Sequence, residues 1–224
     1  MRRYDAVLFD LDGTLLDTLK DLYLADRETM RRFGYPEHTM DEVRMFVGNG
    51  LRKLCERSLP KGEADPRFEE VFQYLRTYYR AHAKDYAVPY AGIVSLMEKL
   101  KREGYRLAVL SNKPDVDVIA LCEEHFHGLG EIYRGARDGT ALKPDPGAVY
   151  SVLNDMNIPK EKAVYVGDSE VDLKTAANAG IPCITVSWGF RSPEALKKAG
   201  AKIITDNTEE LYCAIEQGEP YEDK

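Results

Sequence analysis

The sequence predicts an α/β fold, in which a doubly wound parallel sheet is interrupted after its first strand by a block of helices. Short runs rich in apolar and β-branched residues alternate with segments of helical periodicity. The runs are apolar almost throughout, as in strands that are buried on both faces of a parallel sheet. We therefore expect strands at residues 6–9, 107–110, 163–166, 184–186 and 203–204.

The helices expected between these strands are indicated by apolar spacing and by end signals. Residues 93–100 carry apolar side chains at the i, i+3, i+4, i+7 spacing of one helical face, and Gly104 is a typical helix stop. Further helices are expected after Pro114 and over residues 149–156. This alternation of strand and helix indicates a Rossmann-like, doubly wound core.

The inserted block divides the chain into two expected domains. Its periodicity is helical, and no strand is evident in it. One of its helices is expected to run from Val43 past a glycine pair to Leu54. We expect residues 1–16 and 86–224 to form the Rossmann-like core, and residues 17–85 to form an all-helical cap domain over it.

The composition narrows the class of protein. Hydrophobic residues make up 44% of the 224 residues and charged residues 31%, which is typical of a globular protein. The net charge of −7 argues against nucleic acid as the main partner, because phosphate backbones bind basic surfaces. No apolar run approaches the ~20 residues of a membrane helix or resembles a signal peptide. We therefore expect neither nucleic acid nor a membrane as partner. The charge is compatible with a small anionic substrate, and the composition leaves the choice between a monomer and a homodimer open.

The cysteines indicate the compartment. They are scattered and form no C-x-x-C pair, so neither a zinc site nor a disulfide framework is expected. Reduced thiols are typical of a cytoplasmic protein, which is the localisation we expect. The four residues are Cys55, Cys122, Cys183 and Cys213.

Two carboxylates follow the first predicted strand, in the run Asp10-Leu11-Asp12-Gly13-Thr14. Ligands of open α/β sheets bind beyond the carboxyl ends of the strands, so Asp10 and Asp12 are expected at the active crevice. Two acids aimed at one site repel each other unless a cation or a proton lies between them. Gly13 permits a sharp exit from the strand. This run favours a catalytic site over a loop that only caps the next helix.

Three later motifs carry polar groups at comparable places. Ser111 and Asn112 follow the second core strand, where a hydroxyl can donate to a phosphate oxygen; the alternative for Ser111 is a helix N-cap. Lys143 precedes a helix start that a proline marks. Its ammonium either neutralises a phosphate or lies solvated on the surface. Asp168 and Asp172 follow the third buried strand. With Asp10 they could form an oxygen-rich magnesium site, or they could serve as helix-capping acids.

These four motifs, in this order, resemble those of the haloacid dehalogenase-like hydrolase superfamily. The resemblance covers about residues 4–16 and 86–215, and the helical insert is similar to that superfamily's first type of cap. Within the superfamily the chain resembles the phosphoglycolate phosphatase group. That closer resemblance rests on residues 47–51 (Val-Gly-Asn-Gly-Leu) and 187–191 (Ser-Trp-Gly-Phe-Arg).

The resemblance implies a role for each motif residue. Asp10 would be the nucleophile that forms an aspartyl-phosphate, and Asp12 would be the general acid and then the general base. Asp10, the backbone carbonyl of Asp12 and Asp168 would hold Mg²⁺. Asp172 would orient either water or the ammonium of Lys143. Lys143 would in addition pair with Asp10. The implied phosphate-binding residues are Thr14, Ser111, Asn112 and Lys143.

The cap is expected to select the substrate. Gly48, Asn49 and Gly50 could present backbone amides to a substrate carboxylate and Arg52 could add a charge, or the segment could be a plain helix–helix turn. Arg191 either reaches the site or stays on the surface. The tyrosines near the cap hinge are interpreted as packing residues: Tyr78, Tyr79, Tyr86 and Tyr90.

The function expected from this resemblance is a Mg²⁺-dependent phosphatase for a small phosphate monoester, with 2-phosphoglycolate as the first candidate. A phosphosugar mutase similar to β-phosphoglucomutase would use the same two acids. A pyrophosphatase or a nucleotidase would use the same site. An alternative outside the enzymes is a binding module that has kept the fold but lost the catalytic activity. The complete set of acids, hydroxyl and lysine argues against it.

Overall fold

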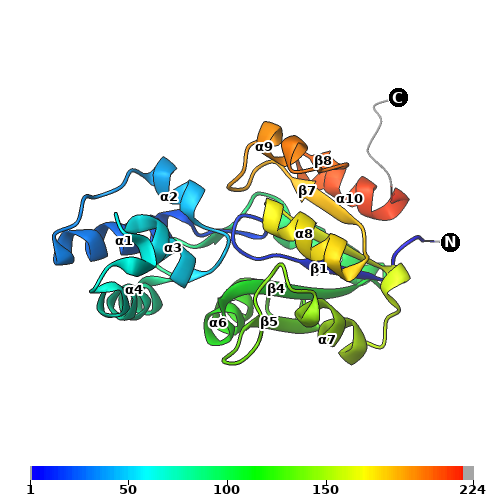
Figure 1. Ribbon diagram of the computed structural model, residues 1–224. Helices are drawn as coiled ribbons and strands as arrows, with labels where there is room; N and C mark the ends of the chain where they lie inside the picture. Colours follow the sequence, from blue (N-terminus) through cyan, green and yellow to red (C-terminus); the bar gives the residue numbers. More distant parts are fainter. Residues whose placement is uncertain (1, 219–224) are drawn as a thin grey trace.

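The computed structural model describes residues 2–218, and it shows an α/β core joined to a helical lobe at one end (Figure 1). The predicted fold class is confirmed. Two 3-10 turns, η1 (Gly62–Ala64) and η2 (Lys160–Lys162), accompany the main elements. The strands are β1 (Ala6–Phe9), β2 (Leu16–Asp17), β3 (Val88–Pro89), β4 (Arg106–Pro114), β5 (Ile132–Ala136), β6 (Ala163–Gly167), β7 (Cys183–Val186) and β8 (Ile204–Thr205). The helices are α1 (Leu19–Phe33), α2 (Met40–Phe46), α3 (Leu51–Ser58), α4 (Phe68–His82), α5 (Ile93–Arg102), α6 (Asp115–Phe126), α7 (Gly147–Asp155), α8 (Glu170–Ala179), α9 (Pro193–Lys198) and α10 (Thr208–Gln217).

The large sheet has six parallel strands in the order β5-β4-β1-β6-β7-β8. The chain begins in the middle, builds outward to β5, and then crosses to the other side of β1. Phe9 at the end of β1 lies opposite Val109 of β4 and Val166 of β6. The residues that follow these three positions therefore emerge side by side at the carboxyl edge of the sheet.

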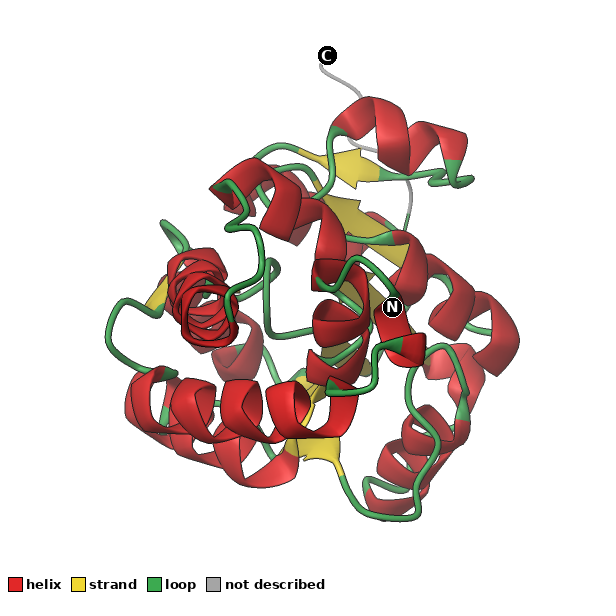
Figure 2. Cartoon of the chain, turned by 60° about the vertical axis from the view of Figure 1, so that its left-hand side comes forward, coloured by secondary structure: helices red, strands yellow, loops and turns green. Residues whose placement is uncertain are grey.

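Successive residues of β1 face two different cores, because side chains alternate along a strand. Val7 and Phe9 pack with side chains from α5, α6 and α10. Ala6 and Leu8 pack with side chains from α7 and α8 on the other face. Figure 2 shows the yellow strands running between the red helices. This double cover explains why the strands read as apolar runs in the sequence.

The helices α1 to α4 have a hydrophobic core of their own, which includes Leu22, Met30, Leu75 and Tyr79. They lie within the segment predicted to be the cap. The antiparallel ribbon of β2 and β3 joins the two linkers at its borders. We keep the boundaries 17–85 as a proposal for the cap domain, called the cap below.

The helix predicted from Val43 to Leu54 is wrong as a single element. The structure has two helices here, α2 and α3, separated by the segment 47–50. Gly48 and Gly50 have φ of 111° and 84°, in the left-handed region where a helix cannot continue. The break gives the cap a loop that faces the core.

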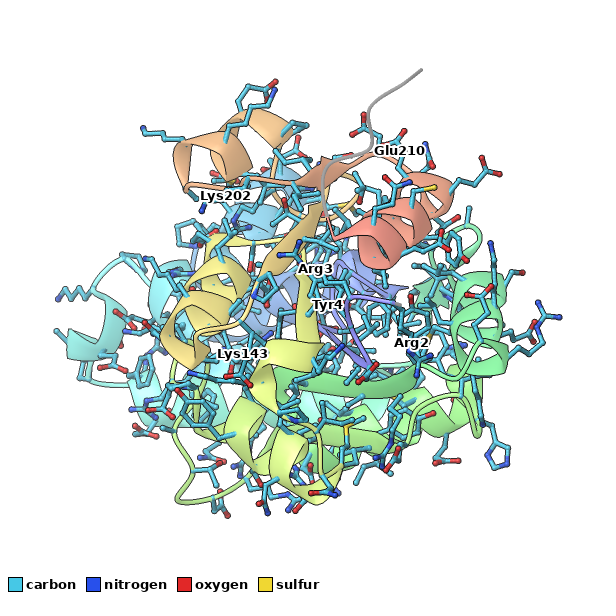
Figure 3. All side chains as sticks on the ribbon, turned by 90° about the vertical axis from the view of Figure 1, so that its right-hand side faces the viewer. Arg2, Arg3, Tyr4, Lys143, Lys202 and Glu210 are labelled. Atoms are coloured by element: carbon cyan, nitrogen blue, oxygen red, sulfur yellow. The ribbon has the colours of Figure 1, made fainter. Side chains whose placement is uncertain are left out.

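The amino edge of the sheet lies at the far end from the cap. Figure 3 shows this end, with Arg2, Arg3 and Tyr4 labelled. The guanidinium of Arg2 lies 4.8 Å from the centre of the Tyr105 ring.

The four cysteines are free thiols. Among residues 2–218, no helix combines the length and the apolar character needed to span a bilayer.

Candidate active site

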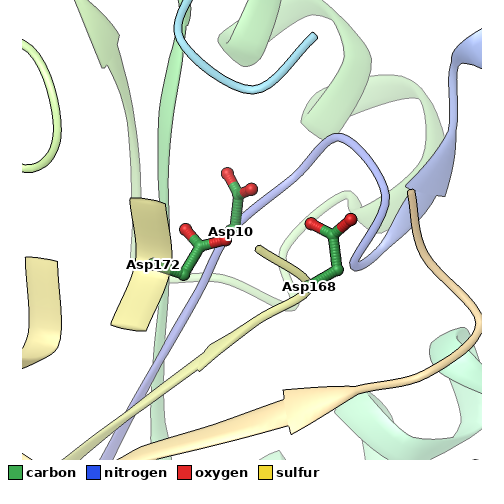
Figure 4. A group of neighbouring side chains, drawn as sticks. All are labelled: Asp10, Asp168 and Asp172. Carbon is green, nitrogen blue, oxygen red and sulfur yellow. The ribbon is translucent and has the colours of Figure 1, made fainter. Parts of the chain in front are cut away.

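Three buried carboxylates meet at the carboxyl edge of the sheet. Asp10 directly follows β1, Asp168 directly follows β6, and Asp172 lies in the first turn of α8. One oxygen from each can be chosen so that all three lie within 4.8 Å of one another. Figure 4 shows the three carboxylates side by side, each from a different segment. The neighbouring positions of β1 and β6 in the sheet produce this convergence.

The electrostatics of this cluster call for a cation. Burial and the nearby Asp172 raise the pKa of Asp10 well above its ordinary value, although Lys143 opposes the shift. Burial and Asp172 also raise the pKa of Asp168 to about 7. With the one ammonium of Lys143, three ionised carboxylates leave two negative charges uncompensated. The donor set and its charge therefore fit a divalent ion that prefers oxygen ligands.

Asp168 is held from two sides. The backbone N–H of Phe190 donates to its Oδ2 at 2.7 Å, and the hydroxyl of Thr14 donates to its Oδ1 at 3.4 Å. A Cβ at Gly13 or Gly189 would clash with Asp168, so both positions require glycine. Thr14 is fully buried and does not line the pocket. The hydroxyl of Thr14 is thus directed at Asp168, and its expected contact with phosphate stays a prediction.

Lys143 links the acids of the cluster. Its Nζ lies 2.8 Å from Oδ1 of Asp10 and 2.7 Å from Oδ1 of Asp172, and it donates to the Tyr165 hydroxyl at 3.1 Å. Burial acts to lower the pKa of Lys143, but the two carboxylates outweigh it and raise the pKa, so the ammonium stays charged. The other oxygen of Asp172 accepts the Ser169 hydroxyl at 2.6 Å. All three donors of Lys143 thus point at protein oxygens.

Asn112 fixes the loop that carries Lys143. Its Oδ1 accepts the backbone N–H of Lys143 at 2.7 Å, and its Nδ2 donates to the backbone carbonyl of Lys143 at 3.1 Å. A longer bond of 3.4 Å reaches the carbonyl of Gly48 in the cap loop. The side chain is therefore committed to backbone groups. These bonds make Asn112 a positioning residue for Lys143, and because Asn112 also lines the pocket, its contact with phosphate stays a prediction.

Asp12 lies beside the cluster and has its own partners. Its Oδ1 accepts hydrogen bonds from the Thr18 hydroxyl and the Lys113 ammonium, both at 2.6 Å. Its Oδ2 accepts the Ser111 hydroxyl at 3.4 Å. Ser111 lies within β4 and α6 begins only at Asp115, so Ser111 is not a helix N-cap. Asp12 and Ser111 both line the pocket.

Lys113 and Tyr79 are pocket residues that the sequence did not single out for function. The Lys113 ammonium donates to the hydroxyl of Tyr79, and both side chains are buried. Burial raises the pKa of Tyr79, which keeps its hydroxyl neutral. Lys113 belongs to the core and Tyr79 to the cap helix α4, so only the tertiary arrangement connects them. The one signal in the sequence was the position of Lys113 directly after Ser111 and Asn112.

Only part of the predicted cap loop lines the pocket. Gly48 and Gly50 line the pocket, whereas Asn49 turns to Arg57, whose Nη2 donates to it at 2.9 Å. Arg52 bonds Glu69 and Glu63 on the outer surface of the cap and does not line the pocket. The expectation that Arg52 adds charge near a substrate therefore finds no support in its position. The cap side of the pocket consists of Leu22, Val47, Gly48, Gly50, Leu51, Leu54 and Tyr79.

Arg191 reaches the pocket and connects the core to the cap. It is 6% exposed. Its Nη1 donates to the carbonyl of Arg44 at 2.7 Å and its Nη2 to the carbonyl of Val47 at 2.8 Å. Its Nε donates to Glu170 of the core at 3.0 Å. Of the two possibilities for Arg191, the structure shows the buried one.

Comparison with known proteins identifies the family. A model of the haloacid dehalogenase-like hydrolases matches residues 7–186. The chain is 34% identical over 218 residues to phosphoglycolate phosphatase 1 of Pseudomonas aeruginosa, and the match covers 94% of this chain and 79% of that protein. It is 34% identical over 185 residues to the phosphoglycolate phosphatase of Aquifex aeolicus, covering 82% of this chain and 85% of that protein.

Solved structures agree with the sequence match. A crystal structure from Lactobacillus delbrueckii, of a protein with a provisional phosphoglycolate phosphatase name, superposes with a TM-score of 0.91 at 33% identity and covers 96% of this chain and 99% of that one. An Asp-to-Asn mutant of CbbY from Rhodobacter sphaeroides, in complex with xylulose-1,5-bisphosphate, gives a TM-score of 0.77 at 27% identity, covering 93% of this chain and 96% of that one. The chain therefore belongs to the haloacid dehalogenase-like hydrolase family and is an enzyme of the phosphatase type.

Proposed function

We propose that the protein hydrolyses a small phosphate monoester, with 2-phosphoglycolate as the first candidate, through an aspartyl-phosphate on Asp10. The observation that carries this proposal is the convergence of Asp10, Asp168 and Lys143 at one edge of the sheet, beneath the cap. The relatives named phosphoglycolate phosphatases support the choice of substrate.

Mg²⁺ is the proposed cofactor. The carboxylates of Asp10 and Asp168 and the backbone carbonyl of Asp12 would hold it, and the uncompensated charge of the acid cluster fits such an ion. When bound, the ion supplies positive charge that allows an anionic nucleophile to approach an anionic phosphoryl group.

The side chains of this chain would perform the bond-making steps. Lys143 orients the Asp10 carboxylate, whose oxygen attacks phosphorus and displaces the alcohol of the substrate. Asp12 gives a proton to the departing oxygen and afterwards removes one from the water that attacks the aspartyl-phosphate. The Ser111 hydroxyl lies at the pocket wall, where it can turn from Asp12 to a phosphoryl oxygen.

The cap supports a small substrate. Leu22, Leu51 and Leu54 form an apolar wall opposite the acids, and Arg191 fastens the cap loop to the core. Closure of the cap over this pocket would exclude bulk water, which otherwise weakens the electrostatic interactions of the site. A substrate with only a few atoms beyond its phosphate suits this arrangement.

A phosphate-release screen of small metabolites with Mg²⁺ tests the proposal, with wild type compared with Asp10→Asn. We expect release from 2-phosphoglycolate by wild type only, and a phosphorylated Asp10 that mass spectrometry detects after rapid quenching in acid. Asp5→Asn, at an exposed ion pair on the far edge, is the matched control and should keep full activity. Turnover by Asp10→Asn near the wild-type rate would exclude the covalent route.

The same assay separates the alternatives. A phosphosugar mutase would interconvert isomers without net release of phosphate, and a pyrophosphatase or nucleotidase would prefer pyrophosphate or nucleotides in the screen. We further propose a cytoplasmic setting, which the four free thiols support. Light scattering after size-exclusion chromatography decides between a monomer and a homodimer.

A further inference from the structure

Three cations line the pocket, and they differ in how far the protein uses their hydrogen-bond donors. Lys143 directs all three N–H groups at protein oxygens. Arg191 donates four of its five N–H groups, to Glu170 and to the backbone carbonyls of Arg44 and Val47. Lys113 bonds only the Asp12 carboxylate and the Tyr79 hydroxyl, within the part of the chain that the structure describes. An ammonium has three donors, so Lys113 retains one for a ligand.

Lys113 is placed on the leaving-group side of the pocket. Its side chain is 3% exposed, and its Nζ lies 2.6 Å from Oδ1 of Asp12, the residue proposed to protonate the departing alcohol. Tyr79 and the apolar Leu22 and Leu54 form the cap wall of the same pocket. A buried ammonium with a spare donor in such surroundings binds an anion strongly, because little water competes for it.

We infer that Lys113 binds a second anionic group of the substrate, and so selects phosphate monoesters of short hydroxy acids over those of neutral alcohols. The inference rests on the proposed function and adds a specificity-determining residue to it. The substrate carboxylate accepts the third donor of Lys113 while the phosphoryl group lies at Asp10. Tyr79 is a positioning residue, because its hydroxyl holds the ammonium from the cap side.

The test compares two substrates that differ in charge and hardly in size, 2-phosphoglycolate and its neutral amide, 2-phosphoglycolamide. In wild type we expect kcat/KM to favour the carboxylate. In Lys113→Met this preference should fall by roughly 10- to 100-fold, which is the usual range for a hydrogen bond to a charged group. Lys113→Arg, which keeps the charge, should restore part of the preference. A purely structural Lys113 would lower kcat/KM for both substrates by the same factor, and that result overturns the inference.

Tyr79→Phe is the matched variant, because it removes the hydroxyl and leaves the ammonium. Its preference for the carboxylate should stay closer to wild type than that of Lys113→Met. A loss of the preference in Tyr79→Phe with an unchanged preference in Lys113→Met would assign the selectivity to the cap and overturn the inference.

A second measurement keeps the inference testable if Lys113→Met does not fold. Glycolate should inhibit the wild-type enzyme about 10-fold more strongly than glycolamide, since only glycolate carries the anion. Equal inhibition contradicts the inference. Hydrolysis of p-nitrophenyl phosphate by wild type separates the two proposals. If the enzyme hydrolyses this ester but shows no preference for the carboxylate substrate, only the proposed role of Lys113 fails. Without any phosphatase activity, the proposed function fails as well.

Discussion

The ammonium of Lys143 lies 2.8 Å from Oδ1 of Asp10 and is buried with it, so one lysine controls the orientation and the charge of the proposed nucleophile. The same ammonium lies 2.7 Å from Asp172. Such a cation between two buried acids compensates their charge in the folded state. Its removal leaves carboxylates that face each other without compensation.

Lys143→Met is therefore expected to lower the free energy of unfolding by about 3–5 kcal/mol, the usual cost of removing one partner from a buried ion pair. Urea unfolding measures this change. Lys84→Met is the matched control: Lys84 pairs with Glu124 on the surface at 2.8 Å, and its loss should cost under about 1 kcal/mol. Equal urea midpoints for the two variants would contradict the structural role of Lys143.

A second prediction concerns the metal. Mg²⁺ at 100 times its Kd should stabilise the wild-type protein by about 2.7 kcal/mol, provided that the ion binds only the folded state. Differential scanning calorimetry with and without chelator measures the effect. Asp168→Asn should abolish the Mg²⁺-dependent shift, whereas Asp5→Asn should keep it, because Asp5 lies on the far edge. A shift that survives in Asp168→Asn would place the ion elsewhere.

The residues of this acid cluster could be predicted from the sequence, because parallel strands bring their carboxyl ends to one edge whatever the distance along the chain. Asp10 and Asp168 each follow a buried apolar run, and the order of the strands makes them neighbours. β5 was not predicted. It lies at the edge of the sheet, all its residues are half-buried, and Arg134 and Gly135 break the apolar pattern.

The partners of the site were harder to predict than its acids. Whether the side chains of Asn112 and Thr14 face a ligand or a neighbouring protein group depends on loops that sequence spacing does not place. The contact between Lys113 and Tyr79 joins the core to the cap. Lys113 precedes a proline, and this sequence context does not indicate whether the lysine side chain points into the protein or into solvent. Arg52 shows the converse: it follows a glycine loop at the pocket, yet its guanidinium extends to Glu69 on the outside.

Asp21 gives a prediction about pH, independent of the acid cluster. It lies in the first turn of α1, is 2% exposed, and accepts the backbone N–H of Tyr86 in the second cap linker at 3.0 Å. Burial raises its pKa from 3.8 to about 6, although the bond from Tyr86 opposes the shift. The folded state therefore holds this proton more tightly than the unfolded state. The contribution to stability is full below about pH 4 and is lost as the pH rises through 6.

Asp21→Asn removes this titration and retains an amide oxygen that can accept from Tyr86. Relative to the variant, wild type should lose stability between about pH 4 and pH 7, as measured by urea unfolding across that range. Other titrating groups are common to both proteins and cancel in the difference. A difference that stays constant with pH would show that the pKa of Asp21 is the same in the folded and unfolded states.

The last prediction concerns the attachment of the cap by Arg191. Its guanidinium donates to the carbonyls of Arg44 and Val47, at the carboxyl end of α2, where unpaired carbonyls and the helix dipole favour a cation. Arg191→Met should therefore weaken closure of the cap over the pocket. We expect kcat/KM to fall by at least about 10-fold, since loss of a charge-assisted hydrogen bond alone costs that much. We also expect a larger radius of gyration in X-ray scattering.

Arg57→Met is the control for this prediction. Arg57 bonds the carbonyl of Phe46 and the side chain of Asn49, so it holds the same loop, but from within the cap. Its loss should disturb the loop without detaching the cap from the core, and the radius of gyration should stay at the wild-type value. If both variants expand the protein equally, the loop's internal order, and not the bridge from Arg191, holds the cap over the acids.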